Sequence, residues 1–162
     1  MKNLKVLGFS VALVTLLLDQ LSKQLVLSWF LNGNHQIVAS PFLNIILSAN
    51  KGISFGMLAA GSTHGVWALI AVACCISFLL GLWIWQAESR FSSMCFGLVL
   101  GGALGYVIDR FIYGAVIDFL DFHAIGYHWY TFNLADCGIV IGAGLLVCQL
   151  FFSTKNSNNN EA

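Results

Sequence analysis

Long apolar stretches that are almost free of charge constrain this chain more than any other feature of its sequence. A helix needs about 20 apolar residues to cross the hydrocarbon layer of a bilayer. Segments 66–85 and 91–108 contain no Asp, Glu, Lys or Arg, and segment 132–152 contains only Asp136, near its start. Only 9% of the 162 residues are charged, whereas about a quarter are charged in soluble domains. This pattern excludes a water-soluble domain and predicts helices that span a membrane.

The first part of the chain contains a further span that polar residues interrupt. Residues 6–18 are apolar, a polar stretch from Asp19 to Gln24 follows, and apolar residues resume at Leu25. We predict one helix here with a polar patch in its outer half. No small-x-small cleavage site follows, so we expect a retained span and not a cleaved leader. The four predicted spans are residues 5–30, 66–85, 91–110 and 132–152.

The basic residues near the ends of the spans predict the orientation, because Lys and Arg are enriched in short cytoplasmic loops. They lie before the first span, between the second and third, and after the fourth: Lys2, Lys5, Arg90 and Lys155. We therefore expect both termini on the cytoplasmic side. The two longer connections, residues 32–65 and 111–131, then lie on the outer side.

The first outer connection has the pattern of a small β element. Apolar runs at 37–38, 42–47 and 53–58, together with the Asn50-Lys51-Gly52 turn, predict short strands around a hairpin on the membrane surface. The predicted fold is an all-α membrane protein of four transmembrane helices, with a small β element and a loop on the outer side. We expect one four-span domain over residues 1–152 and a disordered polar tail over 153–162.

The few charged residues carry most of the remaining information, because ionisable groups at membrane depth are costly. Asp19 and Lys23 are four residues apart on the first span, so they share a helix face and can pair. This pair is either purely structural or part of a site. Asp109 and Arg110 end the third span together, where Arg110 either extends its guanidinium to water or faces a site.

Two further carboxylates lie at the outer ends of neighbouring spans. Asp118 follows the third span between apolar residues, and Asp136 lies at the start of the fourth, so a short connection can bring them face to face. Two carboxylates that share one proton are the chemistry of aspartic proteases. One activates a water, and the other hydrogen-bonds the carbonyl oxygen. Asn133 is a predicted N-cap whose helix terminus favours the Asp136 anion, so we assign Asp136 as the base and Asp118 as the acid of one titrating pair.

Five motifs occur in order along the four predicted spans and their connections. They are Asp19-Gln20-Leu21-Ser22-Lys23, Asn50-Lys51-Gly52-Ile53-Ser54-Phe55-Gly56, Gly101-Gly102-Ala103-Leu104-Gly105 with Ile108-Asp109-Arg110, Val116-Ile117-Asp118-Phe119, and Phe132-Asn133-Leu134-Ala135-Asp136. With these motifs the chain resembles the lipoprotein signal peptidase family, the type II signal peptidases of bacterial inner membranes.

The resemblance implies a membrane aspartyl endopeptidase that cuts prolipoproteins before a diacylglyceryl-modified cysteine, near the periplasmic surface. It implies catalysis by Asp118 and Asp136, substrate binding by Asn50, Arg110 and Asn133, and support of the site by Asp19, Lys23 and Asp109. The expected partners are the prolipoproteins and the lipid bilayer, and the expected state is a monomer without a cofactor.

One position departs from the family pattern. The family usually has Asn after the last glycine of the third-span motif, and this chain has Tyr106. A Tyr hydroxyl donates one hydrogen bond but does not offer the paired donor and acceptor of an amide. We therefore assign Tyr106 no site role and expect it to pack near the membrane interface.

Other functions fit the sequence less well. Seven Lys and Arg balance seven Asp and Glu, so there is no basic field to bind nucleic acid. His123 and His128 share an outer loop but have no acid or cysteine in ligand register, which argues against a metal site. A proton-coupled small-solute carrier is the alternative, because the aspartates could form a relay, although no internal repeat is visible. A non-catalytic scaffold would tolerate replacement of Asp118 and of Asp136.

Overall fold

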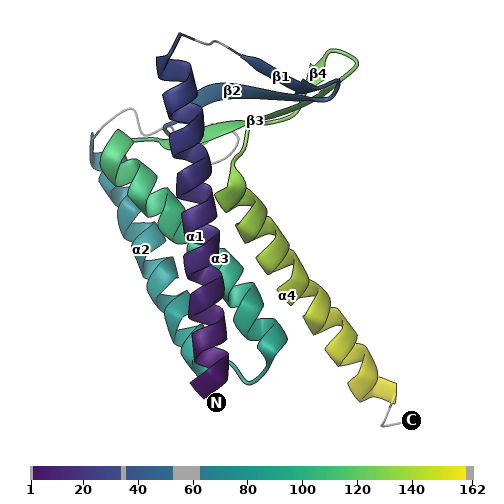
Figure 1. Ribbon diagram of the computed structural model, residues 1–162. Coiled ribbons are helices and arrows are strands. Elements are labelled where there is room, and N and C mark those ends of the chain that lie inside the picture. The colour runs from purple at the N-terminus through teal and green to yellow at the C-terminus, as the bar shows by residue number, and fades with distance from the viewer. Residues whose placement is uncertain (1, 34–35, 53–62, 160–162) are drawn as a thin grey trace.

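The computed structural model describes residues 2–33, 36–52 and 63–159 and contains four long helices in this part of the chain. Their bounds are α1 (Lys2–Leu31), α2 (Thr63–Gln86), α3 (Arg90–Tyr113) and α4 (Leu134–Asn159). All four are long and apolar enough to cross a membrane, which confirms the four predicted spans. Figure 1 shows them as a bundle in which the C-terminal end of α4 leans away from the other helices.

Small residues on α3 let the other helices approach its backbone closely. A Cβ atom added to Gly101 would lie 2.5 Å from the Ala12 carbonyl oxygen of α1, and one added to Gly102 would lie 2.6 Å from the Ala135 carbonyl oxygen of α4. Neither distance leaves room for a methyl group. Close packing at small residues is typical of membrane helices, because lipid supplies no hydrophobic force to press them together.

The ends of α3 and α4 show how the sequence sets the helix bounds. Ser89 caps α3 by accepting a hydrogen bond from the Ser92 amide, and Gly114 ends it with a left-handed φ of 69°. At the C-terminal end of α4, the backbone of residues 153–159 continues the helix, whereas the polar composition of these residues predicted disorder. A helix satisfies its own backbone hydrogen bonds, so it can extend beyond the apolar span.

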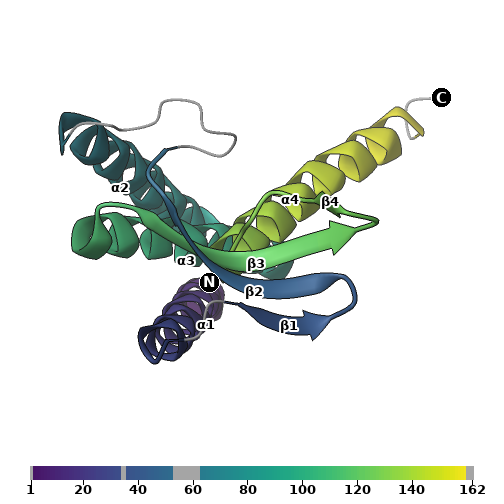
Figure 2. The same cartoon turned by 90° about the horizontal axis from the view of Figure 1, so that it is seen from above.

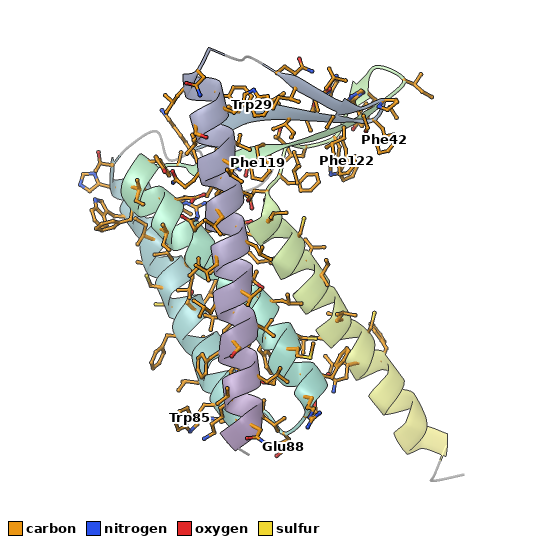
Figure 3. The ribbon with its side chains drawn as sticks, viewed as in Figure 1. Trp29, Phe42, Trp85, Glu88, Phe119 and Phe122 are labelled. Carbon is orange, nitrogen blue, oxygen red and sulfur yellow. The ribbon has the colours of Figure 1, made fainter. Side chains whose placement is uncertain are left out.

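An antiparallel sheet crosses one end of the bundle (Figures 1 and 2). Its strands, in spatial order, are β1 (Ile37–Ser40), β2 (Leu43–Asn50), β3 (Val116–Ala124) and β4 (Tyr127–His128). Seen from above, the strands extend from the centre of the bundle toward the same side as α4 and away from α2 (Figure 2). Among the labelled side chains of Figure 3, Trp29 and Phe119 lie at this sheet end, and Trp85 and Glu88 lie at the opposite end.

The sheet differs from the predicted β element. The turn between β1 and β2 lies at Pro41 and Phe42, whereas the turn was predicted at residues 50–52, where Asn50 ends β2. The predicted strand at 53–58 lies outside the described residues. On its other edge β2 pairs with β3, which was expected to be a loop. The first four residues of β3 are all buried, so the alternation of apolar and polar residues that signals a half-exposed strand is absent.

Candidate active site

Asp118 and Asp136 line the same cavity, although they come from a strand and a helix. The cavity has a volume of about 180 Å³ and lies where the sheet meets the helix ends. Asp118 lies on β3 and is 3% exposed, whereas Asp136 lies in the first turn of α4 and is half-buried. The remaining lining includes Tyr106 and Arg110 of α3 and an aliphatic wall from α2: Leu69, Val72, Ala73 and Ile76.

Two amide side chains hold Asp118 from opposite sides. Asn50, at the end of β2, donates to Oδ2 of Asp118 at 3.1 Å, and Asn133 donates to Oδ1 at 2.6 Å. Ser48 is the partner of Asp118 across the strands, so Asn50 is a diagonal neighbour on the same face of the sheet. Burial raises the pKa of Asp118 to about 6, and the charge of Asp136 adds to this increase, while the two amide donors lower it. Asp118 therefore keeps its proton to a higher pH than an ordinary Asp carboxyl does.

Asp136 is fixed by the cap of α4. The Asn133 side chain accepts from the Asp136 amide at 3.1 Å, and Oδ2 of Asp136 accepts from the Asn133 amide at 3.0 Å. This reciprocal pair is a capping box, and it confirms the predicted N-cap. Because the same Asn133 side chain also donates to Asp118, one fully buried residue sets the positions of both carboxylates.

Tyr106 has a role at the site that the sequence did not predict. Its hydroxyl donates a hydrogen bond to Oδ1 of Asp136. Tyr106 and Arg110 are four residues apart, so they share one face of α3, and both line the cavity. This four-residue spacing from Arg110, a residue assigned to the site, was the sequence signal that could have placed Tyr106 at the site. The expectation that Tyr106 only packs near the interface is wrong.

Arg110 is buried and holds the chain segment next to Asn50. Its guanidinium donates to the Gly52 carbonyl at 3.0 Å and lies over the Tyr106 ring at 5.6 Å from the centroid. The side chain is only 8% exposed, so the alternative in which it extends to water is wrong. Arg110 thus fixes one wall of the cavity.

The predicted Asp19 and Lys23 pair is part of a larger buried cluster. Lys23 Nζ lies 2.7 Å from Oδ2 of Asp19 and 2.7 Å from Oδ2 of Asp109, and all three side chains are 1% exposed or less. Gln20, which the sequence did not single out, bridges the same two acids by donating to Asp109 at 2.9 Å and to Asp19 at 3.2 Å. These four residues, Asp19, Gln20, Lys23 and Asp109, are called the buried ion cluster below.

The buried ion cluster reaches the backbone immediately before each candidate catalytic residue. Asp19 accepts from the Ala135 amide at 3.0 Å, and Asp109 accepts from the Ile117 amide at 3.1 Å. Lys23 links the two acids, so α1 and α3 together hold the chain next to Asp136 and next to Asp118. The structure therefore brings together all eight predicted site residues. Four of them are neighbours that do not line the cavity: Asn133, Asp19, Lys23 and Asp109.

The cavity also opens toward the sheet. A second hollow of about 370 Å³ shares Asn50 and Asp118 with it and adds Ser48, Lys51 and Trp129. Asp118 therefore lies between an aliphatic compartment formed by α2 and a more polar one on the sheet. His123 and His128 line neither compartment; their rings stack with centroids 5.2 Å apart. The Nδ1 atom of His128 lies 2.9 Å from Oδ2 of Asp121. Among the described residues, no three His, Cys, Asp or Glu side chains gather as metal ligands.

Comparisons of the sequence with known proteins point to one family, and a solved structure has the same fold. The family model for signal peptidase (SPase) II matches residues 11–152. A lipoprotein signal peptidase of Methylobacterium sp. (strain 4-46) is 43% identical over 88% of this chain and 87% of its own, and one of Beijerinckia indica is 40% identical over 93% and 91%. A solved structure titled as a bacterial membrane enzyme at 2.3 Å resolution has a TM-score of 0.80 at 27% identity, covering 92% of this chain and 90% of its own.

Proposed function

Because the chain belongs to the signal peptidase II family of aspartic-type membrane peptidases, we propose that it removes signal peptides from prolipoproteins, cutting before a diacylglyceryl-modified cysteine. The observation that carries this proposal is the pair Asp118 and Asp136, bridged by Asn133 at one cavity. Family membership gives no support to the proton-coupled carrier or to a non-catalytic scaffold.

In the proposed reaction the two aspartates share one proton. Asp136 takes a proton from a water whose oxygen attacks the scissile carbonyl carbon, while protonated Asp118 hydrogen-bonds the carbonyl oxygen. The tetrahedral intermediate collapses as the C–N bond breaks, and the proton held by Asp136 passes to the leaving nitrogen. The products are a signal peptide with a new carboxylate and a lipid-bearing cysteine with a free amine. No step requires a metal or an organic cofactor.

The other site residues have supporting roles in this proposal. Asn50, Arg110 and Asn133 bind the substrate backbone or hold the segments that do so, because each places a donor at or beside the cavity. Asp19, Lys23 and Asp109 fix the backbone next to the two catalytic residues. The aliphatic wall of α2 suits the membrane-embedded signal peptide, and the polar compartment on the sheet suits the residues that follow the cysteine.

The proposed setting is the bacterial inner membrane, with residues 1–152 as a single four-span domain. The basic residues of the short connections favour cytoplasmic termini, which puts the sheet and the two aspartates at the periplasmic surface. A substrate held in the bilayer by its lipid presents the bond before its cysteine at that depth. The cavity is formed within one chain, so we propose that a monomer is sufficient.

The substrate class is tested with three versions of one precursor. The purified protein in detergent micelles is given the precursor with a diacylglyceryl cysteine, the same precursor without lipid, and a Cys→Ser version. We expect cleavage of the lipid-modified form alone, immediately before the cysteine, as read by mass spectrometry. Equal cleavage of the unmodified form, or none of the modified form, would contradict the proposed function.

A further inference from the structure

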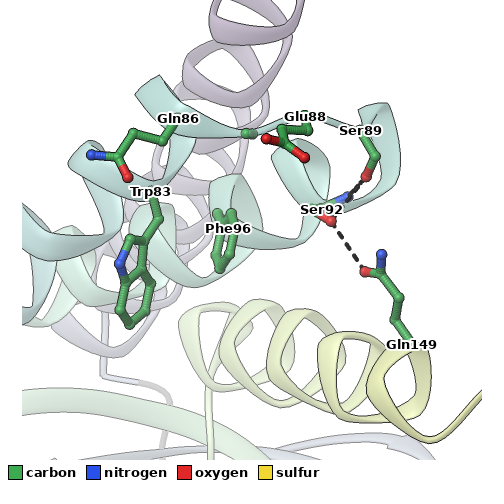
Figure 4. A pocket seen from close by; sticks show the side chains of 8 residues that line it. Trp83, Gln86, Glu88, Ser89, Ser92, Phe96 and Gln149 are labelled. Carbon is green, nitrogen blue, oxygen red and sulfur yellow. Dashed lines mark hydrogen bonds between the residues drawn. The ribbon is translucent and has the colours of Figure 1, made fainter. Parts of the chain in front are cut away.

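A second large cavity, drawn in Figure 4, lies at the opposite end of the bundle from the two aspartates, where Figure 3 labels Glu88. It has a volume of about 500 Å³ and is called the distal cavity here. Side chains of α2, α3, α4 and the α2–α3 connection line it: Trp83, Gln86, Glu88, Ser92, Phe96 and Gln149. The active-site cavity is lined by the same three helices, so the two cavities are two ends of one face of the bundle.

A continuous apolar stripe on α2 connects the two cavities. Val72 and Ile76 line the active-site cavity, and Trp83 lines the distal cavity. Leu79 lies between them at helical spacing, so all four side chains share one face of α2. Each is about half exposed, which leaves this face unoccupied by the rest of the described chain.

The separation of the cavities matches the length of a signal peptide core. On α3, Ser92 lines the distal cavity and Tyr106 lines the active-site cavity, 14 residues further along. At a rise of 1.5 Å per residue the two positions are ~21 Å apart. The apolar core of a signal peptide has roughly 7–15 residues and follows a positively charged segment. A helical core of about 14 residues that ends at the aspartates would therefore bring the charged segment to the distal cavity.

The distal cavity has the chemistry to bind a cation. Of the described residues that line it, Glu88 is the only charged one, and its side chain is exposed. The rings of Trp83 and Phe96, which line the same cavity, lie 5.6 Å apart. Figure 4 shows Glu88 on the connection between α2 and α3, and the Ser92 hydroxyl donates to Gln149. A carboxylate attracts ammonium and guanidinium groups by charge, and aromatic faces in the same cavity attract them as well.

We propose that the distal cavity binds the basic N-terminal segment of the signal peptide while its apolar core lies along the α2 stripe. This inference rests on the proposed function and adds to it a second contact, far from the cleaved bond, through which the enzyme selects its substrate. Glu88 is the charged contact, so its effect depends on the charge of the substrate.

The experiment crosses two enzymes with two substrates. Wild-type protein and Glu88→Gln are assayed in an uncharged detergent with lipid-modified precursors that differ only in the N-terminal segment, with two Lys or with two Gln. We expect Glu88→Gln to raise KM for the Lys precursor about two- to fivefold with kcat unchanged, the range of an exposed ion pair. It should leave KM for the Gln precursor unchanged. Glu88→Lys should favour a precursor with two Glu.

Each other outcome overturns the inference while leaving the proposed function intact, because the wild-type protein still cleaves. An equal change for the Lys and Gln precursors would show that Glu88 acts on the fold. If KM depends on Glu88 only after phosphatidylethanolamine is added, the distal cavity binds lipid and not the signal peptide. A further precursor with four Leu inserted in the apolar core, one helical turn longer, should lose the Glu88 effect; retention would contradict the length argument.

Discussion

Asn133 is the residue on which the geometry of the two carboxylates depends most. Its side chain donates to Asp118 and accepts from the Asp136 amide, while its own amide donates to Asp136. The cap was predictable because Asn directly before an apolar helix is a common N-cap. The contact with Asp118 was not, because it depends on where β3 lies.

Substitution of Asn133 separates these two roles. Asn133→Ser keeps an N-cap oxygen, since Ser and Asn cap about equally well, but loses the donor to Asp118. We expect its melting temperature in detergent to stay near that of the wild type while kcat falls at least tenfold. Asn133→Ala loses both roles, so it should also lose about 1 kcal/mol of stability. Full activity of Asn133→Ser would contradict the bridging role.

The pH dependence of cleavage reports on Asp118. Its pKa of about 6 means that the protonated form is lost as pH rises through that value, so we expect kcat to fall on the alkaline side. The Asn50 donor stabilises the carboxylate and lowers this pKa. Asn50→Ala should therefore move the alkaline limb of the kcat profile to higher pH. A limb that stays in place, or moves to lower pH, would contradict Asp118 as the acid.

At the scale of elements, the buried ion cluster joins α1 and α3 to the starts of β3 and α4. Lys23→Met would leave Asp19 and Asp109 buried without a cation, which costs about 3–5 kcal/mol. We expect a large fall in melting temperature and loss of cleavage. Lys5→Met is the matched control, because Lys5 lies on the same helix with its ammonium over the Trp85 ring, away from the buried ion cluster. Equal stability of the two variants would contradict the role of the cluster.

Two glycines test the close packing of the helices. Gly101→Ala places a methyl group 2.5 Å from the Ala12 carbonyl, so α1 and α3 must move apart and the melting temperature should fall. Gly144 lies on α4 with nothing within 4 Å of an added Cβ, so Gly144→Ala should be neutral or stabilising by up to about 1 kcal/mol. Similar melting temperatures for the two variants would contradict close packing at Gly101.

The sequence predicted the helices better than the sheet. Apolar length determines a membrane span, so α2 and α3 began within three residues of their expected starts. Strand β3 was missed because burial at its start removes the usual alternation. The turn singled out from the sequence was Asn50-Lys51-Gly52, because it resembles a turn more closely than the Pro41-Phe42 turn between β1 and β2 does. Asn50 instead ends β2, and from there it reaches Asp118.

At the scale of the whole molecule, the sheet crosses the helix ends and brings distant parts of the chain to one cavity. The motif residues could be assigned to a site from their order and resemblance. The roles of Gln20 and of the α2 wall could not, because they depend on which faces of the helices meet. For Tyr106 the sequence offered only its four-residue spacing from Arg110, which does not reveal the contact with Asp136. The splay of α4 and the stripe on α2 likewise emerge only from the assembled bundle.

The central claim is that Asp118 and Asp136 together perform the cleavage, and single replacements test it most directly. Asp118→Asn and Asp136→Asn are compared with Asp121→Asn, a buried aspartate of the same strand that contacts Asn44 and His128 and lines neither compartment of the site. The measurement is the cleavage rate of the lipid-modified precursor by folded, purified protein. We predict a loss of about a thousandfold or more for each of the first two variants and a rate within a few-fold of wild type for the third. A rate for Asp118→Asn or Asp136→Asn that matches Asp121→Asn would contradict the account.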